Sequence, residues 1–281
     1  MIIPPDKVTT DEIKAWRGLH LLHFQGSTCS QKVRLILGEL NLEWTSHPVN
    51  LMKHENATPW FLGINPRGVV PVLVHDGVVH VESNDIITYL DESYAPKGAS
   101  YFFEPGSDAA EEAQSLLDME DALHTELRLL TIAFGPLSVK SEKQIEAQKH
   151  NGEYDEHRDS EVQWWQSKLA DGISSSEVRG ALASFTDALS RLDERLAGRP
   201  WLMGERISIV DIAWFVNIQR LERIGYPLER HGHLYRHQRE MAARPAFVAD
   251  ARNPVSRISQ TVFAACRLRN RLKGNRPEGF L

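Results

Sequence analysis

The stretch Gly26-Ser27-Thr28-Cys29-Ser30-Gln31-Lys32-Val33-Arg34 decides the fold, because it joins a short apolar strand to an amphipathic helix. Its small hydroxyl and thiol residues fall where that helix begins. A helix N-terminus offers unpaired backbone N–H groups and a partial positive charge, which stabilise a nearby sulfur anion. Such a position lowers the pKa of a thiol below the free value of about 8.5. The stretch therefore predicts a turn that holds a thiolate.

The residues around this turn predict alternating strands and helices. Residues 19–24 and 44–49 have the composition of short strands. Residues 70–75 and 78–81 predict a hairpin, because the intervening Asp-Gly supplies the positive φ angles of a two-residue turn. Helical spacing recurs in two sets of apolar residues: Val33, Ile36, Leu37 and Leu40, then Ile86, Ile87, Leu90 and Tyr94. This order of elements is that of the thioredoxin fold.

Strand patterns nearly vanish after residue 95, where Pro96 and Gly98 mark a linker. Apolar spacing over 116–127 predicts one long helix, and the spacing over 182–196 predicts another. The charged segment 138–159 predicts a surface loop or a loosely packed helix. The fold class is thus α/β plus all-α, with residues 1–18 as an N-terminal extension, 19–95 as a thioredoxin-like domain, 96–106 as a linker and 107–281 as an all-helical domain.

Composition excludes several classes of function. The formal charge of −6 is mild and forms no basic stripe, so we expect no nucleic-acid partner. The apolar runs are shorter than the ~18 residues of a membrane span, so we expect no membrane partner either. Two cysteines, Cys29 and Cys266, cannot form a disulfide framework, and no secretory signal follows Met1. We therefore expect a cytoplasmic protein.

We interpret two further motifs as structural features of the fold. Ser208-Ile209-Val210-Asp211 precedes an apolar run and predicts a capping box at a helix start. His231-Gly232-His233 followed by His237 could suggest a metal, but no cysteine or acidic residue completes a ligand spacing. We expect an inter-helix loop there and no metal site.

From about Leu19 to Phe247 the chain resembles the glutathione transferase superfamily. The run from Ser27 to Arg34 is similar to the Ser-Ser-Cys-Ser-x-Arg-Val-Arg turn of the zeta class, the maleylacetoacetate isomerases. Other stretches are similar to bacterial beta-etherases, which cleave lignin-type aryl ethers with glutathione: Trp60-Phe61, Ile64-Asn65-Pro66-Arg67-Gly68, Val70-Pro71, His75-Asp76-Gly77 and Glu82-Ser83.

The resemblance implies three candidates for activating the glutathione thiol. Ser27 is the first choice, because zeta-class enzymes have a serine there whose hydroxyl donates a hydrogen bond to the sulfur; the same residue also fits a helix N-cap. Cys29 lies where beta-class transferases have their cysteine, so it either acts covalently or only packs. Ser30 is the residue that meets the serine of beta-etherases when the sequences are aligned. All three remain candidates.

The resemblance also implies the residues that bind glutathione. Val70 binds the cysteinyl part through its backbone, because Pro71 follows it where the family has a cis-proline. Glu82 and Ser83 receive the γ-glutamyl end at a helix N-terminus. Lys53, His54 and Asn56 are weaker candidates for the glycine carboxylate, with solvated loop residues as the alternative.

We therefore expect a glutathione transferase that uses glutathione as a cosubstrate and attacks a small, hydrophobic, aromatic electrophile, with aryl-ether cleavage as one such reaction. A zeta-like isomerase or a dehalogenase is an alternative within the same chemistry. A non-catalytic module with the transferase fold is an alternative of another class. The resemblance implies a homodimer, whose helical domain selects the electrophile and dimerises.

Overall fold

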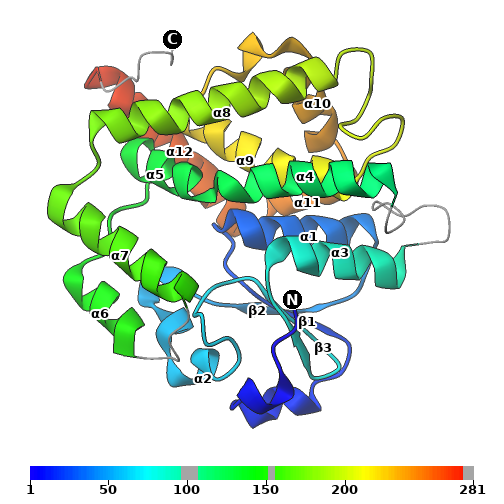
Figure 1. Cartoon of the computed structure of the whole chain (residues 1–281), viewed down its shortest axis with the longest axis vertical. Coiled ribbons are helices and arrows are strands. Elements are labelled where there is room, and N and C mark those ends of the chain that lie inside the picture. The colour runs from blue at the N-terminus through cyan, green and yellow to red at the C-terminus, as the bar shows by residue number, and fades with distance from the viewer. Residues whose placement is uncertain (96–106, 151–155, 275–281) are drawn as a thin grey trace. The chain divides into compact units, whose positions relative to one another are not determined.

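The computed structural model describes residues 1–95, 107–150 and 156–274 (Figure 1). Its strands are β1 (Leu19–His23), β2 (Thr45–Pro48), β3 (Val72–His75) and β4 (Val78–His80). Its first helices are α1 (Thr28–Glu39), α2 (Pro59–Leu62), α3 (Ser83–Tyr94), α4 (Asp108–Ala122), α5 (His124–Phe134) and α6 (Glu142–His150). The later ones are α7 (Glu156–Asp171), α8 (Ser175–Arg195), α9 (Ile209–Ile224), α10 (Gly232–Ala242), α11 (Pro245–Arg252) and α12 (Pro254–Leu272).

The four strands form one mixed sheet in the order β2-β1-β3-β4. β1 runs parallel to β2 and antiparallel to β3, and β3 runs antiparallel to β4. The β3–β4 turn has φ angles of 50° at Asp76 and 83° at Gly77, as a two-residue hairpin with this Asp-Gly pair requires. The predicted thioredoxin-like order of strands and helices, followed by helices alone, is confirmed.

The chain divides into two compact units. The first contains Met1–Val33, Asn41–Ile87 and Ser138–Gly172, and the second contains Arg34–Leu40, Thr88–Leu137 and Ile173–Leu281. The predicted linker at 96–106 lies outside the described residues. The predicted domain limits at 95 and 107 stay a prediction.

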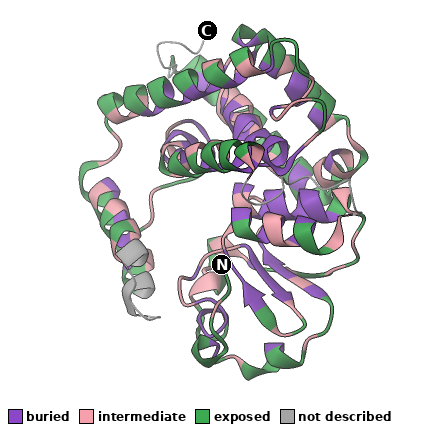
Figure 2. Ribbon diagram, turned by 45° about the vertical axis from the view of Figure 1, so that its right-hand side comes forward, coloured by how far each residue is buried: buried purple, intermediate pink, exposed green. Residues whose placement is uncertain are grey.

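One apolar cluster of the first unit lies against one face of the sheet, and Leu19, Leu21 and Leu73 on the opposite face are buried as well. Successive side chains of a strand point to opposite faces, so this cluster takes alternate residues from the strands. Most residues of β1, β3 and β4 are buried, as the purple strands in Figure 2 show, whereas β2 is mostly exposed. This cluster also includes residues from the N-terminal extension and from the α2 region, and its buried members are Val8, Ile13, Leu22, Val49, Phe61, Ile64, Val72, Val74, Val79 and Val81.

The charged segment 138–159 contains helix α6 and the start of α7. Ile145 of α6 is buried, as are Val162 and Trp165 of α7. The Nζ of Lys140 lies 4.6 Å from the ring centroid of Trp165. Within the described part of the segment, the expected loop or loosely packed helix contains helix α6, which buries the side chain of Ile145.

Helix α9 forms the centre of the second unit, and its first turn is held by a buried carboxylate. The predicted capping box between Ser208 and Asp211 is present. Asp211 Oδ2 accepts the Ser208 N–H at 2.8 Å and the Ser208 hydroxyl at 2.7 Å. Its Oδ1 accepts the Leu202 N–H at 2.8 Å and lies 2.8 Å from His237 Nε2. Asp211 and His237 are both 0% exposed.

Two predictions about the helical part are wrong. The helix expected over 116–127 breaks at Leu123, whose ψ is 4° and whose N–H donates to the Glu120 carbonyl three residues back. The apolar spacing continues across this break, and no proline or glycine marks it, so the sequence predicted a single helix. The loop expected at 231–237 is instead the first part of α10, because Leu234, His237, Gln238 and Met241 are buried at helical spacing.

We predict that Asp211→Asn lowers the free energy of unfolding by about 3–5 kcal/mol, because the amide nitrogen would replace a buried oxygen that two groups contact at hydrogen-bond distance. Ser208→Ala should cost about 0.5–2 kcal/mol, as for other N-cap losses. Urea unfolding measures both. The control is Asp187→Asn, which alters an exposed pair with Arg191 and should stay within about 0.5 kcal/mol of wild type. Equal effects of Asp211→Asn and Asp187→Asn would contradict the structural role of Asp211.

Candidate functional site

The register of the sheet brings three sequence motifs to one end. Leu22, near the end of β1, pairs with Val72 at the start of β3. Leu73 of β3 pairs with His80 at the end of β4. Three segments therefore lie at the same end of the sheet: the turn after β1, the Val70-Pro71 pair before β3 and the Glu82-Ser83 pair after β4. These are the motifs that the sequence identified separately.

Ser27 caps helix α1. Its Oγ accepts the Ser30 N–H at 3.2 Å, its carbonyl accepts the Gln31 N–H at 3.0 Å, and its own N–H donates to the Phe24 carbonyl. Its side chain is half-buried. Among the residues that the structure describes, no acceptor takes the hydroxyl hydrogen of Ser27. The hydroxyl is therefore a donor that remains available to a ligand.

Ser30 and Cys29 differ from Ser27 in their surroundings. Ser30 is 0% exposed, and its Oγ accepts the Phe24 N–H at 3.3 Å. This hydrogen bond ties the first turn of α1 back to the end of β1. Cys29 is half-buried and forms no disulfide. Of the three candidates, Ser30 is thus enclosed, whereas Ser27 and Cys29 retain exposed surface.

The Val70–Pro71 peptide bond is cis, as predicted. Asn65 Nδ2 donates to the Val69 carbonyl at 2.9 Å and so holds the loop just before it. Neither the N–H nor the carbonyl of Val70 has a hydrogen-bond partner within the described parts of the chain. Val70 therefore presents a free backbone donor and a free backbone acceptor just before β3, and an extended peptide could pair with these two groups as an added strand does.

Glu82 and Ser83 begin helix α3, as predicted. The Ile86 N–H donates to the Glu82 carbonyl at 2.9 Å, which makes Glu82 the residue that precedes the helix. Glu82 has a positive φ of 65°, an uncommon conformation for a non-glycine residue. The Ser83 side chain is buried, and the first N–H groups of α3 have no partner within the helix. A carboxylate would find both hydroxyl and amide donors there.

The three candidates for the glycine carboxylate differ in exposure and in hydrogen bonding. Lys53 is exposed. His54, with a φ of 58°, has its Nε2 2.7 Å from the Nε2 of Gln144 in α6. Asn56 Nδ2 donates to the Gly68 carbonyl at 2.7 Å, so its amide supports the loop that leads to Val70. Lys53 alone of these three has an exposed cation.

The sequence did not reveal two partners of the predicted residues, Arg67 and Gln144, nor the buried contact between Lys32 and Asn84. Arg67 forms an ion pair with Glu82. Lys32 is buried, and its Nζ donates to Asn84 Oδ1 at 3.1 Å. Gln144 reaches His54 from the charged segment. Arg67 and Lys32 lie within motifs that the sequence analysis quotes, so their positions pointed to the site. Nothing in the sequence indicated a role for Gln144.

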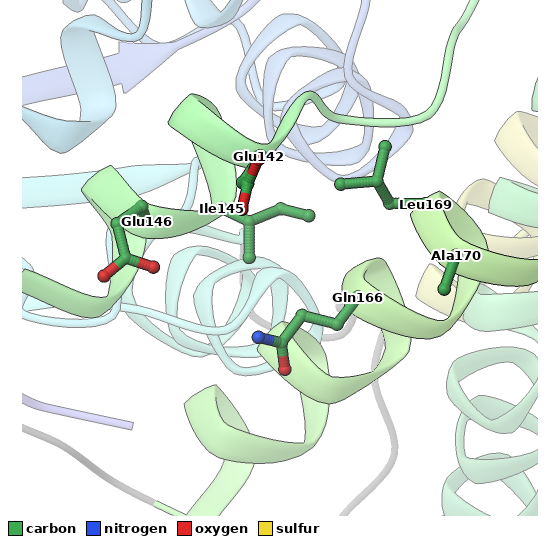
Figure 3. Close-up of a pocket in the computed structure, with 6 residues that line it drawn as sticks. All are labelled: Glu142, Ile145, Glu146, Gln166, Leu169 and Ala170. Atoms are coloured by element: carbon green, nitrogen blue, oxygen red, sulfur yellow. The ribbon is translucent and has the colours of Figure 1, made fainter.

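A pocket of about 280 Å³ lies between α6 and α7. Figure 3 shows side chains from both helices around it. Its lining combines apolar and acidic or amide groups: Glu142, Ile145, Glu146, Gln166, Leu169 and Ala170. The pocket contains none of the predicted site residues.

The described residues contain no group of three or more His, Cys, Asp or Glu side chains suited to a metal ion. In the same parts of the chain, no helix combines the length and the apolar character needed to cross a membrane.

Family comparisons match both parts of the chain. A model described as the glutathione S-transferase N-terminal domain matches residues 26–93, and one described as the glutathione S-transferase C-terminal domain matches residues 155–249. A zeta-class glutathione S-transferase of Euphorbia esula is 45% identical over 76 residues, which are 27% of this chain. The match spans only about a third (34%) of that plant relative's length.

Two bacterial relatives are similar over most of the chain. A maleylacetoacetate isomerase of Pseudomonas aeruginosa is 26% identical over 233 residues, which cover 82% of this chain and 93% of the relative. Protein LigF of a Sphingobium strain is 27% identical over 214 residues, covering 74% and 80%. The crystal structure of that beta-etherase has a TM-score of 0.70 at 26% identity and covers 83% of this chain and 98% of its own.

We predict that Ser30→Ala lowers the free energy of unfolding by about 1–3 kcal/mol, because the Phe24 N–H loses its acceptor. Thermal and urea unfolding measure the loss. The control is Ser176→Ala on the exposed side of α8, which should stay within about 0.5 kcal/mol of wild type. A Ser30→Ala protein as stable as wild type would show that this hydrogen bond does not hold the turn.

Proposed function

The chain belongs to the glutathione S-transferase superfamily, and we propose that it activates the thiol of glutathione for attack on an electrophilic aromatic substrate. The observation that carries this proposal is the Ser27 hydroxyl at the start of α1, which accepts the Ser30 N–H and keeps its own hydrogen for a ligand. A hydrogen bond to the charged form of an acid favours that form, so this donor lowers the pKa of a thiol beside it.

Ser27 is a better candidate than Ser30 or Cys29. A glutathione sulfur cannot reach Ser30 without opening the turn, because Ser30 is 0% exposed. Its hydroxyl already serves the Phe24 N–H. Cys29 retains exposed surface but follows Ser27 within the helix, so its proposed role is to pack beside the bound thiolate. Glutathione is a cosubstrate in this scheme, and no metal takes part.

The remaining parts of glutathione have matching partners. The free N–H and carbonyl of Val70 pair with the cysteinyl backbone as an added strand, next to Pro71. The Ser83 hydroxyl and the first N–H groups of α3 donate hydrogen bonds to the γ-glutamyl carboxylate, while Glu82 faces its ammonium group. Arg67 fixes the Glu82 carboxylate through their ion pair. Lys53 is the proposed cation for the glycine carboxylate, with His54 and Asn56 supporting the loop beneath it.

Aryl-ether cleavage is the proposed reaction, because the beta-etherase LigF is similar over most of both chains. The thiolate attacks the carbon that bears the ether oxygen. A C–S bond forms, the C–O bond breaks, and the phenolate leaves and takes up the proton that the thiol released. Residues 19–95 bind glutathione in this proposal, and residues 107–281 bind the electrophile and form a homodimer in the cytoplasm.

Isomerisation is the second candidate, because the maleylacetoacetate isomerase of Pseudomonas aeruginosa is also similar over most of both chains. In that reaction glutathione adds to a conjugated double bond, permits rotation and leaves unchanged. Incubation with stoichiometric glutathione and either an aryl ether or a maleyl compound separates the two. Consumption of glutathione with release of a phenol supports the etherase, whereas a changed double bond with glutathione intact supports the isomerase. A protein that a glutathione column does not retain would be a non-catalytic module.

We predict that Ser27→Ala raises the pKa of bound glutathione by about 1–2 units and slows turnover near neutral pH by about 10- to 150-fold, as expected for the loss of a hydrogen bond to a charged group. The loss should shrink at higher pH, where the thiolate forms unaided. The pH profile of kcat/KM measures the shift.

Three controls separate activation from capping in this experiment. Ser27→Thr keeps a hydroxyl and should retain most of the activity, whereas Ser27→Gly keeps most of the capping but lacks a donor and should behave like Ser27→Ala. Ser30→Ala should leave the profile of the folded enzyme unshifted. A shift for Ser30→Ala with none for Ser27→Ala would move the activating role to Ser30.

We predict that Ser83→Ala weakens glutathione binding by about 1.5–3 kcal/mol, because the γ-glutamyl carboxylate loses a charge-assisted hydrogen bond. Isothermal titration calorimetry measures this change. Ser93→Ala, at the far end of the same helix, is the control and should leave the affinity unchanged. Equal affinity for Ser83→Ala and wild type would remove Ser83 from the site.

A further inference from the structure

Helix α12 exposes a row of large apolar side chains. Among the described residues, twelve large hydrophobic side chains are exposed, and five of them lie on this helix. Their spacing places them on the side opposite the buried residues Ser256, Phe263 and Asn270. The five exposed fractions are 52% at Val255, 64% at Ile258, 41% at Val262, 59% at Leu268 and 80% at Leu272.

The same helix concentrates unpaired positive charge. Residues 254–272 include four arginines and no acidic residue, in a chain whose formal charge is −6. Arg267 donates to the Glu222 carbonyl at 3.2 Å. Arg257, Arg269 and Arg271 are exposed and have no ion-pair partner in the parts of the chain that the structure describes. By helical spacing, Arg257 and Arg271 border the apolar row, and Arg269 lies within it.

An exposed apolar row with unpaired arginines at its border and within it fits the surface of an anionic bilayer. Apolar side chains of an interfacial helix enter the boundary between headgroups and acyl chains, while basic side chains meet lipid phosphates. A second copy of this chain fits less well, because a two-fold contact through α12 would bring the arginines of both copies together.

We propose that the exposed face of α12 docks the protein onto a bilayer that contains acidic phospholipids. The docking needs no membrane span, so it is compatible with apolar runs that are too short to cross a bilayer. The proposal is independent of the thiol chemistry assigned to Ser27, because α12 contributes no residue to that site.

Co-sedimentation with lipid vesicles tests the proposal. The wild-type protein should sediment with vesicles of phosphatidylcholine and phosphatidylserine, remain in solution with phosphatidylcholine alone, and dissociate as salt is added. Each arginine near an anionic surface changes partitioning by about fivefold. The triple variant Arg257→Gln, Arg269→Gln and Arg271→Gln should therefore reduce partitioning more than tenfold. The apolar variant Ile258→Ser, Val262→Ser and Leu268→Ser should do the same.

A charge-matched control removes three exposed arginines from elsewhere in the second unit: Arg179→Gln, Arg191→Gln and Arg230→Gln. This variant should bind vesicles like wild type, and all variants should keep wild-type turnover of a water-soluble substrate. An equal loss of binding in the control, or no binding by wild type, would overturn the proposal. So would an apolar variant that changes the sedimentation mass without changing vesicle binding, because the face would then join two copies. Binding to polyglutamate but not to vesicles would indicate an acidic protein partner instead.

Discussion

The hydrogen bond from the Ser30 N–H to Ser27 Oγ is the interaction on which the candidate site depends. It fixes where α1 begins, and it leaves the Ser27 hydroxyl hydrogen available. The neighbouring bond from the Phe24 N–H to Ser30 Oγ ties the same turn to the end of β1. Two serines three residues apart therefore have different surroundings: the Ser30 hydroxyl is enclosed and holds the turn, whereas the half-buried Ser27 is the residue that we propose as the donor to the glutathione sulfur.

The sheet extends this arrangement to the rest of the site. Because β1 and β4 both run antiparallel to β3, one end of the sheet contains the end of β1, the start of β3 and the end of β4. Val70 and Ser83 thereby lie at the same end of the sheet as the Ser27 turn. A one-residue slip in either pairing would exchange the side chains on the two faces of the sheet, and Val72 and Val74 would lose the cluster that they share with Leu22. This packing therefore also holds the site together.

The sequence predicted this region well because its signals are local. The Asp76-Gly77 turn, the helix start after Ser27 and the capping box at Ser208 each depend on residues a few positions apart. The break at Leu123 and helix α10 were missed for physical reasons. Leu123 ends α4 by backbone geometry without a proline or glycine, and α10 begins at a glycine among histidines although its buried positions keep helical spacing. The contact between His54 and Gln144 and the uncovered face of α12 depend on tertiary packing, which no local pattern encodes.

Titration of the ultraviolet absorbance of the glutathione thiolate, in complex with wild-type and Ser27→Ala protein, tests the central claim most directly. It reports the ionisation of the sulfur without requiring knowledge of the electrophile. Our account predicts that wild-type protein lowers the pKa of the bound thiol below that of free glutathione and that Ser27→Ala returns it toward the free value. The same depressed pKa in both proteins would contradict it, because another group would then hold the thiolate.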